Sequence, residues 1–104
     1  MNWLYEENRI YSVNDDNDLL AETTYVFKTK NEVIIDHTYV NPILRNQGIA
    51  NKMLVLVMDH FKTKEYRVSA TCSYANAWLK KHHEEYKDMI SDGLSDEMIA
   101  CKIG

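Results

Sequence analysis

Six consecutive residues, Arg45 to Ala50, have the types and spacing of a loop that binds phosphate. Gly48 has no Cβ atom to keep an oxyanion away from the backbone. The segment precedes a strongly amphipathic stretch, and the first amide groups of a helix donate hydrogen bonds at the positive end of its dipole. Arg45 adds a fixed positive charge. The pattern therefore indicates a pyrophosphate site, as nucleotide-type cofactors require; the alternative is that Gly48 only makes a turn before the helix.

Cys72 is the first candidate for nucleophilic or proton-transfer chemistry. It ends an alternating segment and directly precedes Ser73, which we expect to cap a helix. A cysteine at a helix N-terminus favours the thiolate, so Cys72 can serve as a nucleophile or as a proton donor. The alternative is that Cys72 is a small hydrophobic side chain on the strand face that carries Val68 and Ala70.

His37 is the second candidate, because a histidine can accept a proton near neutral pH. Its predicted strand face also carries Val33, Ile35 and Tyr39, which favours a core or edge histidine instead. The run from His82 to Glu85 is not expected to bind a metal. Adjacent helical residues point about 100° apart, and H-E-x-x-H spacing is absent.

The elements that position these residues follow from hydrophobic periodicity. Alternating segments predict strands at residues 9–13, 20–29, 32–40 and 66–72, and helical spacing predicts helices from 47 to about 64 and from 74 to about 82, with a further short helix at 95–102. A long helix between the third and fourth strands makes these two strands parallel. The fold class is therefore α/β (α+β), an antiparallel meander followed by α-β-α, in the order β-β-β-α-β-α.

Two motifs resemble the GNAT superfamily of N-acetyltransferases. The strand that ends at Val40, followed by R-N-Q-G-I-A and a long helix, resembles motif A, whose pattern is Q/R-x-x-G-x-G/A. The segment C-S-Y-A-N-A-W that starts at Cys72, with H-H-E-E-Y after it, is similar to the C-S-Y…W…H-P-E-Y segment of very small, single-domain GNAT-like proteins, except that the proline is replaced. The resemblance covers roughly residues 20–88 and does not extend to the segment after Ile90.

The resemblance implies a minimal GNAT core that binds acetyl-coenzyme A. Backbone groups near Tyr39 and Val40 would contact pantetheine where the third and fourth strands separate. The expected pyrophosphate and coenzyme A contacts come from the loop, the long helix and the second helix, namely Arg45, Gln47, Gly48, Ile49, Ala50, Ser73 and Asn76. For Asn76, the alternative is a local capping partner of Ser73.

The implied activity is transfer of the acetyl group from acetyl-coenzyme A to an amine that the sequence does not identify. The catalytic candidates are Cys72 and His37. A non-catalytic coenzyme A-binding or protein-interaction module is the alternative, because so short a chain has little room for an acceptor pocket.

Composition bounds these expectations. With 104 residues, 45% hydrophobic and 27% charged, residues 1–104 are expected to form one domain. No apolar run approaches a membrane span and no secretory signal is apparent, so we expect a cytoplasmic protein without a membrane segment. Cys72 and Cys101 fit neither a C-x-x-C pair nor a zinc framework.

The charge distribution also bears on ligands. A net charge of −4 argues against general nucleic-acid binding. Between Lys28 and Lys81, however, nine basic residues stand against four acidic ones, which suits a ligand with several phosphate charges. A merely solvated surface is the alternative, and the sequence does not reveal the oligomeric state.

Overall fold

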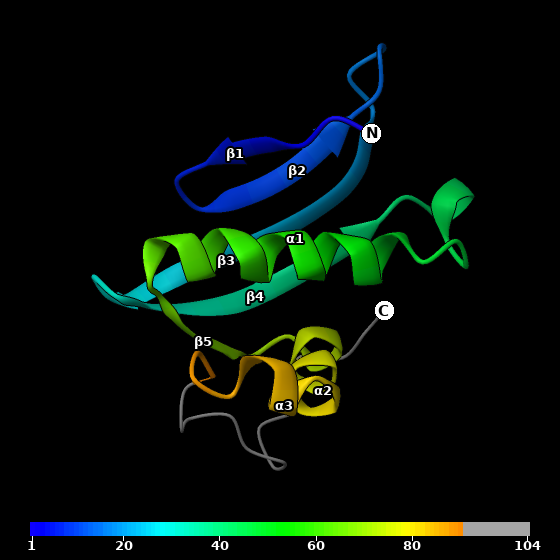
Figure 1. Ribbon diagram of the computed structural model, residues 1–104. Coiled ribbons are helices and arrows are strands. Elements are labelled where there is room, and N and C mark those ends of the chain that lie inside the picture. The colour runs from blue at the N-terminus through cyan, green and yellow to red at the C-terminus, as the bar shows by residue number, and fades with distance from the viewer. Residues whose placement is uncertain (91–104) are drawn as a thin grey trace.

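Five strands form one sheet in the order of the chain (Figure 1). The computed structural model describes residues 1–90, so the helix predicted at 95–102 lies outside the described residues. The strands are β1 (Leu4–Glu6), β2 (Arg9–Val13), β3 (Leu19–Thr29), β4 (Glu32–Val40) and β5 (Arg67–Ala70). Neighbours are antiparallel from β1 to β4, whereas β5 pairs with β4 in parallel.

The helices lie after the meander. A 3₁₀ turn, η1 (Pro42–Leu44), precedes α1 (Ile49–Lys64), and β5 is followed by α2 (Ser73–Lys81) and the short α3 (His83–Tyr86). Figure 1 shows α1 crossing in front of β3 and β4. Because α1 connects β4 to β5 and these strands are parallel, α1 begins beside the carboxyl end of both. None of the helices within residues 1–90 is long and apolar enough to cross a bilayer.

The predicted fold class is confirmed, with β1 added before the predicted strands and α3 after the second predicted helix. The sequence indicated β2 and β4 with the bounds that they have, and the parallel pairing of β4 with β5 is as expected. The strand β1 was missed because its three residues are all exposed, so they carry no alternation of buried and exposed positions. It is a strand because it pairs with β2, from Leu4↔Tyr11 to Glu6↔Arg9.

The core lies on one face of the sheet. In α1 the buried side chains recur at helical spacing: Met53, Leu54, Val57, Met58 and Phe61. They pack on the buried strand positions Ile10, Ala21, Tyr25, Val33, Ile35, Val68 and Ala70 and on Trp78 and Leu79 of α2. Phe61 is fully buried and meets the ring of Tyr25 edge-on, with centroids 4.8 Å apart. Aromatic and aliphatic burial thus holds α1 on the sheet.

A β-bulge in β4 changes which side chains face the core. Thr24 pairs with His37 but Tyr25 pairs with Ile35, so Asp36 is the extra residue. Beyond the bulge the alternation is reversed, and His37 is exposed while Val33 and Ile35 are buried. The sequence interpretation that put His37 on the face of Val33 and Ile35 was therefore wrong, because a bulge shifts the period of two by one residue.

The packing predicts a large cost for removing the Phe61 ring. Phe61→Ala should lower the free energy of unfolding by about 3–5 kcal/mol, because it leaves a cavity between α1 and Tyr25. Urea unfolding followed by circular dichroism measures this. Val55→Ala on the same helix is the matched control, since Val55 is 36% exposed and its loss should cost less than about 1 kcal/mol. Equal costs for the two variants would contradict the proposed packing.

Candidate functional site

The strands β4 and β5 separate after four residue pairs. Their pairing runs from Glu32↔Arg67 to Ile35↔Ala70. The carbonyl of Ile35 then accepts hydrogen bonds from the backbone N–H groups of Thr71 and Cys72, at 3.0 and 3.3 Å. β4 itself continues to Val40, paired with β3 on its other side. Residues 36–40, which include the predicted contacts Tyr39 and Val40, therefore present a strand edge that β5 does not cover.

The loop after β4 is held in place by its own hydrogen bonds. The Asn41 side chain donates to the carbonyl of Leu19 at 3.1 Å and accepts from the N–H of Ile43 at 3.1 Å, which caps η1. Arg45 Nε donates to the carbonyl of Val40 at 3.1 Å, and Gln47 Nε2 donates to that of Ile43 at 3.2 Å. These bonds hold the Arg45 guanidinium beside the end of β4.

Gly48 occupies the N-cap position of α1 in a left-handed conformation, with φ 73°. A Cβ atom there would meet nothing within 4 Å, so the requirement for glycine is conformational, and the space in front of it is open. Within the part of the chain that the structure describes, no side chain caps α1, and its first turn has no acidic residue. The first intrahelical bond runs from the N–H of Lys52 to the carbonyl of Gly48 at 3.1 Å. The amides of residues 49–51 therefore have no intrahelical acceptor, as in the first turn of any α-helix.

Cys72 lies across the gap between β4 and β5, at the junction of β5 and α2. It is the N-cap residue of α2, and its side chain is 3% exposed. Its Sγ lies 3.5 Å from Oγ1 of Thr38. Ser73 was expected to cap this helix, but it is the first helical residue, and no side-chain cap bond is present. That prediction was wrong because the extended backbone ends one residue earlier, at Cys72.

Asn76 is fully buried one turn into α2. Its Nδ2 donates to the carbonyl of Ala70 at 3.2 Å, and its backbone N–H donates to the carbonyl of Cys72 at 2.8 Å. The alternative in which it caps Ser73 was therefore wrong. Within residues 1–90, Asn76 Oδ1 has no hydrogen-bond partner. A buried acceptor without a donor is costly, so Asn76 Oδ1 destabilises this part of the fold in the absence of a partner.

The two catalytic candidates lie on different faces of the sheet. Thr38 shares the core face with Thr23, its partner on β3, and contacts Cys72. His37, one residue earlier, points to the opposite face, where it pairs with Thr24 and is exposed. Sequence reasoning missed Thr38 because, without the bulge, it would have faced away from Cys72.

Trp78 connects the middle of α2 to the first turn of α1 and packs in the core. It is 6% exposed, and its Nε1 donates to Oδ1 of Asn51, in the first turn of α1, at 2.8 Å. The His82 ring stacks on Trp78 at 4.1 Å and lies 2.9 Å from a carboxylate oxygen of Glu85. In the described residues, no group of three or more potential metal ligands is present.

Comparisons with known proteins agree with this geometry. A family model described as GCN5-related N-acetyl-transferase matches residues 10–89. A GCN5-like protein from Staphylococcus aureus, proposed to be an N-acetyltransferase, is 36% identical over 92% of each chain, with a TM-score of 0.73. No curated protein matches the chain.

Two more distant structures share the fold alone. The aminoglycoside N-acetyltransferase AAC(6')-Iy, solved in complex with CoA, is 14% identical over 92% of this chain and 75% of that one, with a TM-score of 0.51. A protein from Deinococcus radiodurans R1, proposed to be an acetyltransferase, is 11% identical over 92% of this chain and 66% of that one, with a TM-score of 0.52.

The buried amide of Asn76 should matter for stability. Asn76→Ala removes the donor to the Ala70 carbonyl and should lower the free energy of unfolding by about 1–3 kcal/mol. Lys81→Ala, an exposed position on the same helix, should change it by less than about 0.5 kcal/mol. Thermal and urea unfolding of both variants measure this. A stability loss no larger in Asn76→Ala than in Lys81→Ala would show that the Ala70 contact contributes nothing.

Proposed function

Because this chain belongs to the GCN5-related N-acetyltransferase family, we propose that it binds acetyl-coenzyme A and transfers the acetyl group to an amine. The observation that carries the proposal is the N-terminus of α1. There, Gly48 in a left-handed conformation leaves the first amides open, without a side-chain cap, beside the edge of β4 that β5 leaves uncovered.

The pyrophosphate of acetyl-coenzyme A would lie at the start of α1. The amides from Gln47 to Ala50 would donate to its oxygens, and Arg45 would supply a positive charge at the end of β4. The absence of acidic residues from the first turn of α1 supports this assignment, since a carboxylate there would repel the phosphates.

The pantetheine arm would run along residues 36–40 of β4. Backbone groups of Tyr39 and Val40 would then form hydrogen bonds with the amides of the arm. The arm would take the place that β5 would occupy if its pairing with β4 continued past Ile35. Ser73, at the start of α2, would lie beside the arm. Asn76 Oδ1 has no partner within residues 1–90, but it is fully buried, so it would accept from the arm only if α2 shifts locally. In this arrangement the thioester lies near Cys72 and Thr38.

The transfer joins groups from both faces of the sheet. The amine nitrogen attacks the thioester carbonyl, the new C–N bond forms and the C–S bond breaks. His37 on the opposite face takes the proton that the amine loses, and the Cys72 thiol gives a proton to the departing coenzyme A thiolate. Both side chains then exchange protons with water, so the products are an amide and a free thiol. Direct transfer thus needs the amine to approach from the face of His37.

The first test separates charge from backbone conformation at Gly48. Asn46 already has a positive φ, so asparagine tolerates this conformation in the same loop, and aspartate has the same shape. Gly48→Asp should weaken acetyl-coenzyme A binding at least about tenfold more than Gly48→Asn, because it places a negative charge beside a phosphate. Calorimetric titration measures both. Equal affinities of the two folded variants for acetyl-coenzyme A would show that its phosphates do not bind at this loop.

The second test concerns phosphate charge in general. Affinity for acetyl-coenzyme A should fall as salt rises from about 0.05 to about 0.5 M, because the Debye length shortens. Desphospho-coenzyme A, which lacks the 3′-phosphate, should bind less tightly than coenzyme A. If affinity is insensitive to both changes, the basic stretch between Lys28 and Lys81 is only solvated surface.

The third test concerns Cys72 and the alternative of a binding module without turnover. Release of free coenzyme A is followed over a panel of amines and peptides. Cys72→Ala should abolish transfer while acetyl-coenzyme A affinity is kept, and Cys72→Ser should retain part of the rate. Undiminished acetyl transfer by Cys72→Ala would show that Cys72 only packs in the core. His37→Gln would then be tested next.

Mass spectrometry after incubation with acetyl-coenzyme A decides how Cys72 acts. A proton donor leaves no adduct. One added acetyl group on Cys72, trapped at acidic pH, would replace direct transfer with a covalent route. Tight binding without release of coenzyme A for any amine in the panel would favour the non-catalytic module.

A further inference from the structure

The Cys72 thiol contacts a hydroxyl group on the neighbouring strand. Its Sγ lies 3.5 Å from Oγ1 of Thr38, a separation suited to a hydrogen bond with the large sulfur atom. Thr38 is half-buried on β4, and Cys72 is 3% exposed at the junction of β5 and α2. The contact therefore joins β4 to the start of α2, beside the strand edge along which pantetheine is proposed to run.

Hydrogen bonds fix the backbone on both sides of the Cys72 thiol. The N–H of Cys72 donates to the carbonyl of Ile35 at 3.3 Å, and the carbonyl of Cys72 accepts from the N–H of Asn76 at 2.8 Å. Although Cys72 is the N-cap residue of α2, its side chain makes no cap bond to the amides of that helix. Its contact with Thr38, rather than helix capping, therefore orients the thiol.

The position of the Thr38 hydroxyl is set by the register of the sheet. The bulge at Asp36 turns Thr38 to the core face, where it pairs with Thr23 of β3. Threonine is branched at Cβ, so its side chain has few rotamers and its hydroxyl has few alternative positions. A paired strand, and not a loop, thus brings this hydroxyl to Cys72.

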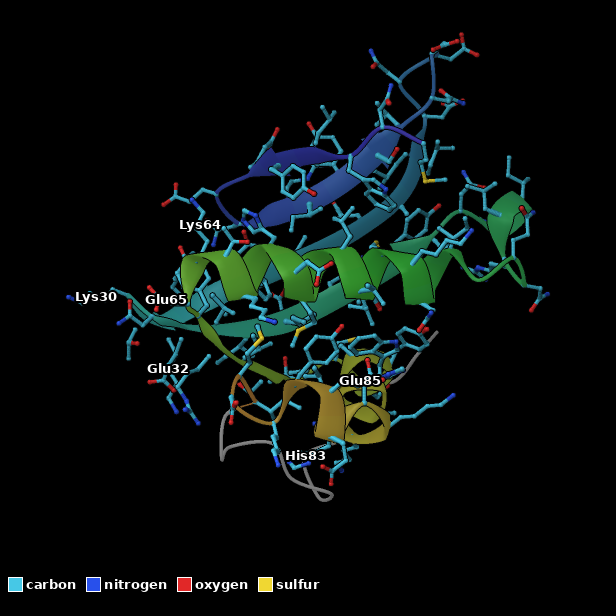
Figure 2. All side chains as sticks on the ribbon, viewed as in Figure 1. Lys30, Glu32, Lys64, Glu65, His83 and Glu85 are labelled. Atoms are coloured by element: carbon cyan, nitrogen blue, oxygen red, sulfur yellow. The ribbon has the colours of Figure 1, made fainter. Side chains whose placement is uncertain are left out.

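Many of the charged side chains lie elsewhere. Figure 2 shows four of them at the end of the sheet where α1 ends, namely Lys30, Glu32, Lys64 and Glu65. On β4, Asp36 and His37 lie on the face opposite Thr38, and Lys52 in the first turn of α1 is exposed. Burial raises the pKa of Tyr74 on α2, so its hydroxyl stays protonated. Two neutral groups beside Sγ favour a negative charge on it: the Thr38 hydroxyl and the start of α2.

The proposed transfer creates such a charge. The S–H bond of Cys72 breaks, the S–H bond of coenzyme A forms, and the electron pair of the broken bond stays on Sγ. Burial makes this thiolate costly unless a donor meets it. The Thr38 O–H can donate to Sγ before and after the proton leaves, and the bond is stronger once the sulfur is charged. Thr38 keeps its own proton, and Cys72 regains through water the proton that His37 took from the amine.

We propose that Thr38 is a positioning residue for acetyl transfer: its hydroxyl donates to Sγ of Cys72, leaves the S–H free to point at the thioester, and stabilises the thiolate that follows. This role rests on the proposed function. Two substitutions separate a hydrogen bond from packing, because valine keeps the shape of threonine without the hydroxyl and serine keeps the hydroxyl without the methyl group.

Ionisation of the Cys72 thiol is measured first, by ¹³C NMR of its Cβ on the full chain without cofactor or amine. Thr38→Val should raise the pH midpoint of ionisation by about one unit, because the thiolate loses a donor. Thr38→Ser should shift it much less. Thr23→Val is the matched control, since Thr23 is fully buried on the same face and its Oγ1 has no partner within residues 1–90. It should leave the midpoint unchanged.

The acetyl transfer is then measured by release of coenzyme A. Thr38→Val should lower kcat about tenfold while the KM for acetyl-coenzyme A stays within about twofold, because the lost bond acts on the departing thiolate and not on cofactor binding. Thr38→Ser should keep most of the rate, and Thr23→Val should react as the unaltered chain does.

Several results would overturn this role. A larger loss of kcat in Thr38→Ser than in Thr38→Val would show that the methyl group packs and the hydroxyl takes no part. Equal midpoints, or equal kcat values, for Thr38→Val and Thr23→Val would show the same. A Cys72 thiol that stays protonated until the chain unfolds would show that no thiolate is stabilised. Absence of turnover in the unaltered chain would overturn the proposed function together with this role, whereas turnover that Thr38→Val leaves unchanged would overturn this role alone.

Discussion

The parallel pairing of β4 with β5 places the groups of the proposed acetyl-transfer site at one edge of the sheet. Parallel strands need a crossover, and α1 supplies it, so the start of α1 lies at the carboxyl end of β4. The start of α2 lies at the same edge because α2 follows β5 directly. The hydrogen bond from Trp78 to Asn51 joins the first turn of α1 to α2. Two helix N-termini and an uncovered strand edge therefore converge without any long loop.

The bulge at Asp36 divides the chemistry of that edge between two faces. Because one extra residue reverses the alternation, Thr38 rather than His37 faces Cys72. Thr24 Oγ1 donates to Asp36 at 2.6 Å, which stabilises the bulged residue on the exposed side. The adjacent residues His37 and Thr38 thus lie on opposite faces of the sheet, and Thr38 contacts Cys72. This arrangement suits the proposed reaction, in which the acetyl donor and the amine acceptor approach from opposite faces.

The start of α1 is open, whereas the rest of the helix packs on the sheet. Met53, Leu54, Val57 and Met58 are fully or almost fully buried on the sheet. At the start of the helix, Gly48 leaves the first amides without a side-chain cap; near the end, Phe61 packs on Tyr25.

The sequence by itself determined the elements whose signals are local. Alternation defined β2 and β4 to the residue, helical spacing defined α1, and the glycine marked the residue before that helix, whose positive φ the structure then gave. It also placed Cys72 between a strand and a helix. Only the tertiary structure decided which faces these residues occupy. The bulge moved His37 to the opposite face, a buried hydrogen bond turned Asn76 inward, and pairing with β2 made β1 a strand although its residues are exposed. Those outcomes depend on register and on contacts between distant residues, which no window of neighbouring residues contains.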